Sequence, residues 1–117
     1  MNTYKDLIVW QKSIELVLEI YRITSLLPSE EKFGLVSQMR RCSVSIPSNI
    51  VEGYARKNRR ENANFINIAF GSATELETQI LISNKLQFIS QSEWNKAENL
   101  LTEVLKMLYR YRESLYQ

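Results

Sequence analysis

The sequence predicts an all-α protein, arranged as an up-down-up-down antiparallel four-helix bundle. The 117 residues include 3 glycines and 2 prolines, so breaks between elements are few and the elements are long. Apolar residues recur at spacings of three and four, and no segment shows the sustained alternation of a half-buried strand. A hydrophobic fraction of 44% lets one domain, residues 1–117, bury a core without metal or disulfide.

The first predicted helix has two neighbouring apolar rows and ends before Pro28, because proline disfavours helical backbone in the residue before it. Together the rows make a face wider than one core requires. This width fits a helix that also packs against another subunit, or equally a central helix covered on both sides. The two rows are Leu7, Trp10, Ile14, Val17, Tyr21 and Thr24, and beside them Leu16, Ile20, Ile23 and Leu27.

The second predicted helix begins after Ser29, a residue type that caps helix N-termini. Its inward row is Leu35, Met39, Cys42, Ile46, Ile50 and Gly53. Pro47 lies inside the helix and is expected to kink or split it near residues 43–45, because proline removes a backbone donor. Cys42 is most simply a small buried apolar residue. The chain has no histidine, which excludes a Cys-His nucleophile.

The third and fourth predicted helices each start at a capping signal. Asn58 with Glu61 opens the third, and Ser90 with Glu93 opens the fourth. Small residues at 71–73 are expected to let the third helix approach a neighbour closely. The fourth helix has the clearest apolar row, which is Trp94, Ala97, Leu101, Val104, Leu108, Tyr111 and Leu115.

Polar residues on the second and third helices are predicted to form a structural layer. Arg41 and Glu75 are equally distant from Asn58, so antiparallel helices would bring Arg40 or Arg41 to Glu75 or Glu77. We interpret the layer as an ion-pair network that fixes helix register, the alternative being a polar groove or ligand site. Its members are Arg40, Arg41, Asn49, Glu52, Glu75 and Glu77.

No residues of the sequence indicate an enzyme active site. Two nearby carboxylates can serve acid–base catalysis, but the chain lacks a histidine, a metal-binding triad and a glycine-rich phosphate loop. The sequence therefore predicts no catalytic residue, no metal and no cofactor.

Positive charge is concentrated in one segment. The net charge of +2 conceals a local excess at residues 40–60, where six cations accompany one acid. Arg56, Lys57, Arg59 and Arg60 form the densest part, and they are the candidate nucleic-acid-binding residues. The alternative is a solvated loop that keeps the protein soluble. Assembly into a ring would favour the first interpretation, because symmetry multiplies a modest basic patch.

The expected location is the cytoplasm. Cys42 has no second cysteine in the chain with which to form a disulfide, and the first residues lack the layout of a signal peptide. No apolar run approaches the roughly 20 residues that span a bilayer, so no membrane contact is expected.

Three segments give the sequence a family resemblance: YKDLIVWQKSIELVLEIY at 4–21, LPSEEKFGLVSQMRRCSVSIPSNIVEGYAR at 27–56 and FINIAFGSATELETQI at 65–80. It resembles the four-helix bundle proteins named for the intervening sequences of bacterial 23S rRNA genes. Val51 stands where an alanine is expected. The family motif falls on Ser45, Ile46, Pro47, Asn49, Ile50, Glu52, Gly53 and Arg56, and on Gly71, Ser72, Glu75, Leu76, Glu77 and Gln79.

The resemblance implies a homo-pentamer with no enzymatic activity. Proteins of this group are similar in fold to the accessory variability determinant of diversity-generating retroelements, a pentameric ring that binds nucleic acid and a reverse transcriptase. Two hypotheses follow for this chain. One is an oligomeric protein that binds RNA or DNA, or acts as an adaptor, through its basic residues. The other is a scaffold that receives a helix or peptide of a partner protein.

Overall fold

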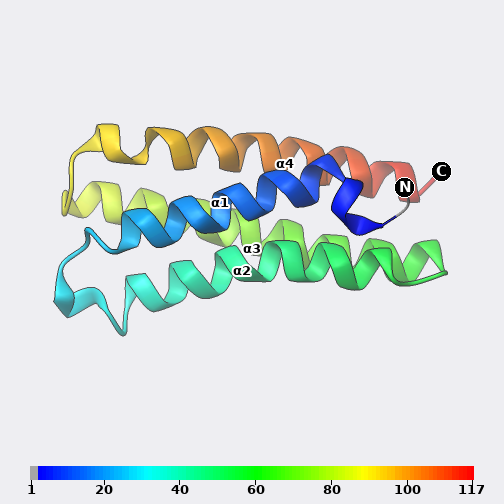
Figure 1. Ribbon diagram of the computed structural model, residues 1–117, viewed down its shortest axis with the longest axis horizontal. Helices are drawn as coiled ribbons and strands as arrows, with labels where there is room; N and C mark the ends of the chain where they lie inside the picture. Colours follow the sequence, from blue (N-terminus) through cyan, green and yellow to red (C-terminus); the bar gives the residue numbers. More distant parts are fainter. Residues whose placement is uncertain (1–2) are drawn as a thin grey trace.

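The computed structural model describes residues 3–117 and contains four long helices. No strand occurs among these residues, and the all-α prediction is confirmed. Figure 1 shows the helices side by side along the long axis of a molecule measuring 44 × 23 × 21 Å. The elements are η1 (Tyr4–Asp6), α1 (Ile8–Thr24), η2 (Ser29–Glu31), α2 (Leu35–Tyr54), α3 (Arg59–Leu86), η3 (Gln91–Trp94) and α4 (Asn95–Leu115).

Residues near the start of α2 contact residues near the end of α3, and residues further along α2 contact residues earlier in α3. Met39 lies near the start of α2, and its sulfur accepts from the Ser83 hydroxyl near the end of α3 at 3.8 Å. Ser45 and Ser72 share a hydrogen bond of 2.8 Å further along. These contacts therefore lie progressively closer to the short turn that joins the two helices.

Helix α1 is linked through one ion pair to α4 and through another to η3, the short segment before α4. Lys12 Nζ lies 3.4 Å from Glu103, and Arg22 Nη1 lies 3.5 Å from Glu93. Arg22 also donates two hydrogen bonds, of 3.0 and 2.7 Å, to the buried carboxylate of Glu19. These bonds from Arg22 hold the pKa of Glu19 below its ordinary value.

One cluster of buried apolar side chains takes members from all four long helices. In α1 the row of Leu16, Ile20 and Ile23 is fully buried, whereas Trp10 and Val17 of the neighbouring row are half-buried. Of the two predicted rows, the second thus faces the core, and three residues of the first, Trp10, Ile14 and Val17, line a groove described below. The predicted row of α4 is buried at Trp94, Ala97, Leu101, Val104 and Leu108.

Two predicted helix starts are wrong. Ser29 begins the short η2 segment, and α2 starts six residues later at Leu35, whose N–H donates to the Glu31 carboxylate at 3.4 Å. Ser90 precedes η3 and makes no capping bond, its hydroxyl lying 3.1 Å from that of Ser92. In both places a single 3-10 turn precedes the helix, as is frequent at helix N-termini, and neither serine makes a capping bond.

Helix α2 is continuous from Leu35 to Tyr54 and contains Pro47, so the proline does not split it. Near the expected kink, the Ser43 hydroxyl donates to the Arg40 carbonyl at 2.9 Å, and the Ser45 hydroxyl bonds to that of Ser72.

The small residues at 71–73 bring α3 close to its neighbours, since Ser72 bonds to Ser45 of α2 at 2.8 Å and Ala73 is buried in the core, but Gly71 takes no part in this. A Cβ atom on Gly71 would have no neighbour within 4 Å, and the residue is exposed. Gly53 of α2 instead lies against Asn62 of α3, where an added Cβ would come within 2.6 Å of the Asn62 side-chain oxygen. A further tight contact between the two helices therefore lies beside the α2–α3 turn.

Candidate nucleic-acid interface

The α2–α3 turn is fixed by the cap of α3. The side-chain oxygen of Asn58 accepts hydrogen bonds from the backbone N–H groups of Arg60 at 2.8 Å and Glu61 at 3.2 Å. A cap of this kind satisfies donors that the first helical turn leaves unpaired. The predicted cap at Asn58 is thus present, and it sets the position of the basic residues on either side of the turn.

The four predicted basic residues differ in how firmly they are held. Arg56 pairs with Glu52 at 3.0 Å, and its guanidinium lies 4.8 Å from the Phe65 ring centroid. Arg59 donates to the main-chain carbonyl of Gln117. Lys57 and Arg60 are exposed and form no ion pair within residues 3–117. Two cations are therefore restrained by the protein, and two are available to a ligand.

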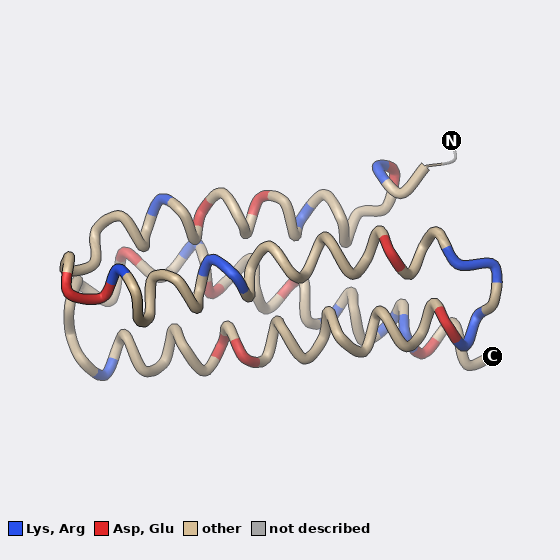
Figure 2. The backbone as a smooth tube through the Cα atoms, turned by 90° about the horizontal axis from the view of Figure 1, so that it is seen from below, with Lys and Arg blue, Asp and Glu red and all other residues tan. Residues whose placement is uncertain are grey.

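The C-terminal turns of α4 add cations that the sequence analysis did not select. The Arg59 bond to Gln117 brings the end of the chain to the turn, and Figure 2 shows basic residues of both segments at the end marked C. Arg110 is exposed, and Arg112 donates to the Asn67 side-chain oxygen at 3.2 Å. The alternation of tyrosine and arginine at 109–112 was the available sequence signal. We refer to the turn and the last turns of α4 together as the basic end.

A groove between α3 and α4 begins at this basic end and has a volume of about 580 Å³. The Arg112 guanidinium lies close to two aromatic rings that line the groove, 4.7 Å from the Phe70 centroid and 5.5 Å from the Tyr109 centroid. The groove is lined by Phe70, Thr74, Glu77, Leu105, Lys106, Tyr109 and Arg110.

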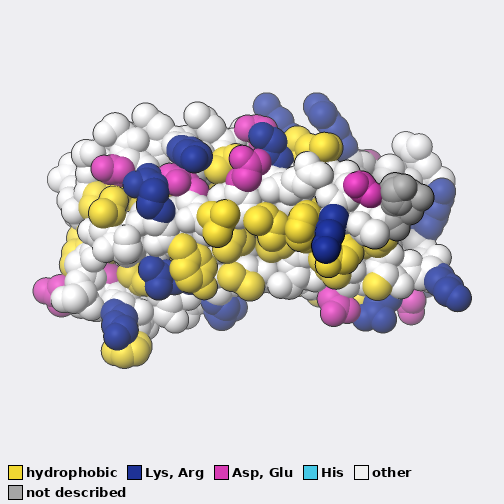
Figure 3. Space-filling view, in the orientation of Figure 1, with side chains coloured by type: hydrophobic (Ala, Val, Ile, Leu, Met, Phe, Trp, Pro, Cys, Tyr) yellow, Lys and Arg dark blue, Asp and Glu magenta, His cyan; other side chains and the backbone are white. Residues whose placement is uncertain are grey.

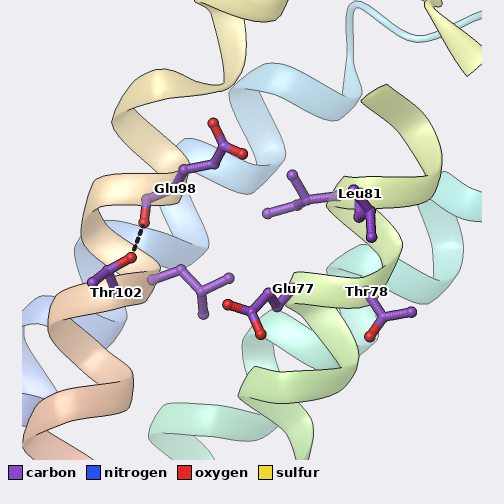
Figure 4. A pocket seen from close by; sticks show the side chains of 7 residues that line it. Glu77, Thr78, Leu81, Glu98 and Thr102 are labelled. Carbon is purple, nitrogen blue, oxygen red and sulfur yellow. Dashed lines mark hydrogen bonds between the residues drawn. The ribbon is translucent and has the colours of Figure 1, made fainter. Parts of the chain in front are cut away.

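Further along the same two helices lies a smaller pocket of about 310 Å³ that Glu77 also lines. Figure 4 shows Glu77 of α3 and Glu98 of α4 on opposite sides of it. The Glu98 carboxylate accepts a hydrogen bond from Gln91 at 3.1 Å. No group of three or more potential metal ligands occurs in the described part of the chain, so this pocket offers two carboxylates without a metal-binding set.

The six residues of the predicted polar layer do not form one layer. Arg41 lies 3.5 Å from Glu75 across the α2–α3 contact, and both side chains are at least half exposed. Arg40 points instead to α1, where it donates to the Thr24 hydroxyl at 2.9 Å and lies 4.5 Å from the Tyr21 ring centroid. Consecutive residues on a helix point about 100° apart, so Arg40 and Arg41 face different neighbours.

The other three members are dispersed as well. Asn49 donates to the carbonyl and hydroxyl oxygens of Ser45 within α2, at 2.8 and 3.0 Å. Glu52 pairs with Arg56, and Glu77 lies in the α3–α4 groove. The structure therefore joins one predicted pair across helices, and these six residues form no dry ion-pair network.

Cys42 is buried inside the core, and this burial raises the pKa of its thiol. The side-chain amide of Gln79 donates to the sulfur at 3.5 Å. A buried thiol with a raised pKa is a poor nucleophile, in agreement with the structural interpretation of this residue.

A second surface feature is an apolar groove between α1 and α2, about 310 Å³ in volume. Figure 3 shows hydrophobic side chains gathered in a band along the middle of the face on which these two helices lie. Val44, which lines this groove, is 41% exposed although it is an apolar residue. The groove is lined by Tyr4, Trp10, Ile14, Val17, Val44, Pro47, Ser48 and Val51.

Among residues 3–117, no helix combines the length and apolarity needed to traverse a bilayer.

Comparison with known proteins gives a matching family and similar solved structures. The model of a family described as 23S rRNA-intervening sequence protein matches residues 5–110. A crystal structure from Bacteroides thetaiotaomicron, of a protein with unknown function from the S23 ribosomal protein family, is similar with a TM-score of 0.83 and 28% identity. The similarity covers 91% of this chain and 96% of that chain. No curated protein matches the sequence significantly.

Proposed function

Since the chain belongs to the family of 23S rRNA-intervening sequence proteins, we propose that it is a non-enzymatic homo-oligomer that binds RNA or DNA, or acts as an adaptor. In this proposal residues 1–117 form one domain, an up-down-up-down antiparallel bundle, located in the cytoplasm. It needs no cofactor and no catalytic residue.

The observation that supports nucleic-acid binding most is the presence of two available cations at the basic end. Lys57 and Arg60 lie on either side of Asn58, whose cap holds the backbone of Arg60 before any ligand arrives. Lysine and arginine side chains bind phosphate oxygens and release the counterions condensed on a nucleic acid. Arg56 and Arg59 lie beside them and add to the local positive potential, although each already has a partner in the protein.

The homo-oligomer is supported by the α1–α2 groove. Val44 of this groove is 41% exposed, its other lining residues are mostly apolar, and an apolar band of this kind marks a surface that another protein covers. We propose that a second copy covers it and that five copies close into a ring. A ring would repeat the basic end around its axis, so a modest patch on one subunit would become a broad basic surface.

The test is binding of single-stranded and duplex RNA and DNA, measured by fluorescence anisotropy over a salt series. The double variant Lys57→Ala/Arg60→Ala should lose affinity and reduce the slope of log K against log salt by roughly 0.7–0.9 for each phosphate that the protein no longer neutralises. The control variant Lys85→Gln/Lys96→Gln removes two exposed lysines at the other end of the molecule and should leave the slope unchanged.

A second candidate function is a scaffold for a partner protein, and the same α1–α2 groove favours it. An amphipathic helix or an apolar peptide could lie along Val17, Val44 and Val51. Light scattering separates the two candidates. A homo-oligomer that Val44→Asp dissociates assigns the groove to a second copy, whereas a wild-type monomer leaves it open to a different protein.

A further inference from the structure

We propose that the α3–α4 groove binds an unpaired base of a single-stranded nucleic acid by stacking it on Tyr109. This inference rests on the proposed nucleic-acid function and adds a second contact site to it. The turn residues Lys57 and Arg60 would hold phosphates, whereas the groove would distinguish single strands from duplexes.

The geometry around Tyr109 resembles a stacking platform. The residue is 52% exposed although its ring lines the groove, so an incoming base can reach it. Arg112 lies 5.5 Å from the ring centroid, and its guanidinium is held in turn by Phe70 at 4.7 Å and by Asn67 at 3.2 Å. The platform is therefore ordered before binding, which lowers the entropy cost of stacking.

The charges of the groove match a base with its flanking phosphates. Lys106 and Arg110 line it, are exposed and form no ion pair within residues 3–117. Arg112 is partly neutralised by Glu113, at 3.9 Å. Cations such as Lys106 and Arg110 beside an exposed aromatic ring are the combination with which proteins bind single strands, where bases stack and phosphates follow the cations.

Glu77 favours a single strand over a duplex. Its exposed carboxylate lines the same groove and forms no ion pair in the described chain. Near a duplex, whose phosphates are closely spaced along both strands, this carboxylate would repel the backbone. An unpaired base can instead turn its Watson–Crick edge to Glu77, and the carboxylate can accept a hydrogen bond from an amino group on that edge.

The groove also has a suitable size. Its volume of about 580 Å³ lies within the range of roughly 300–1,000 Å³ that is usual for small-molecule sites. Leu105 and Phe70 supply an apolar wall on which a base can lie out of water.

The test compares Tyr109→Leu with Tyr109→Phe, since leucine removes the ring and phenylalanine keeps it. Affinity for a short single-stranded RNA, and separately for single-stranded DNA, should fall about 5- to 100-fold in Tyr109→Leu and stay near wild type in Tyr109→Phe. The salt slope should not change, because stacking releases no counterions. Duplex binding should be the same in all three proteins.

A 2-aminopurine base in the strand gives a second readout that does not depend on affinity. Wild type and Tyr109→Phe should quench its fluorescence at saturation, and Tyr109→Leu should not. Circular dichroism verifies that each variant is folded. The stacking site would be overturned if Tyr109→Leu bound single strands as tightly as wild type does. It would also be overturned if the variant lost as much affinity for duplexes as for single strands. In either case the basic end would remain as the binding surface. Wild type that binds no nucleic acid at low salt would overturn both proposals.

Discussion

Replacing Gly53 by alanine tests the tight α2–α3 contact that supports the basic end. A Cβ atom there would lie 2.6 Å from the Asn62 side-chain oxygen, 3.0 Å from the Asn62 carbonyl oxygen and 3.2 Å from the Phe65 Cβ. The Asn62 side chain also donates to the Tyr111 hydroxyl at 3.2 Å, so moving it away disturbs a contact with α4. The new methyl group therefore forces α2 and α3 apart.

Two opposing effects set the magnitude. Alanine is a better helix former than glycine by about 1 kcal/mol, which would stabilise the variant. Overpacking costs about 1–3 kcal/mol, and this site belongs at the upper end because a backbone oxygen cannot rotate out of the way. We expect Gly53→Ala to lower the free energy of unfolding by about 1–2 kcal/mol.

Gly71→Ala is the matched control, since it makes the same chemical change in a helix with nothing within 4 Å of the new atom. The propensity effect acts alone there, and the variant should gain about 0.5–1 kcal/mol. Urea unfolding followed by far-UV circular dichroism measures both, at one protein concentration because assembly adds to apparent stability. The reasoning is refuted if Gly53→Ala is as stable as Gly71→Ala.

Three further predictions concern other parts of the molecule. The pKa of Glu19 is lowered, so Glu19 stabilises the fold above the ordinary carboxyl pKa and stops doing so as pH falls through its folded pKa. The urea midpoints of wild type and Glu19→Gln should therefore differ at neutral pH and converge in acid, and a constant difference contradicts this. Cys42 should react with a thiol reagent at least about tenfold more slowly in the folded protein than in urea, and equal rates would show that it is accessible. Val44→Asp should shift the light-scattering mass from oligomer to monomer, whereas Ser48→Asp on the groove's polar edge should shift it less; an unchanged Val44→Asp mass rules this interface out.

The helices could be predicted because their signals are local. The α4 row from Trp94 to Leu108 repeats at helical spacing, and the structure buries it. Asn58 caps α3 because an asparagine side chain reaches the first N–H groups of its own helix. The predicted starts at Ser29 and Ser90 are wrong because a 3-10 turn precedes each helix and neither serine makes a capping bond, which residue type and spacing alone could not show.

The candidate site was less predictable, because its geometry depends on contacts between distant segments. Spacing from the turn placed Arg41 at the height of Glu75, but it could not show that Arg40 turns toward Thr24 of α1. Small size indicated close helix contact at residues 71–73, and Ser72 and Ala73 do make it, but size alone could not show that Gly71 faces open space while Gly53 lies against α3.

The basic residues of α4 were missed for a similar reason. Arg110 and Arg112 are about 50 residues from the α2–α3 turn in sequence. The hydrogen bond from Arg59 to the Gln117 carbonyl brings the last turns of α4 close to that turn. The same fold places Tyr109 beside Lys106 at the mouth of the α3–α4 groove.

The most direct test of nucleic-acid binding at the basic end is the salt dependence of affinity in wild type and in Lys57→Ala/Arg60→Ala. Wild type should bind at low salt with a steep negative slope of log K against log salt, and the variant should bind more weakly with a shallower slope. Wild type that shows no binding at low salt, or a variant with the same affinity and slope as wild type, would contradict the proposed role of Lys57 and Arg60.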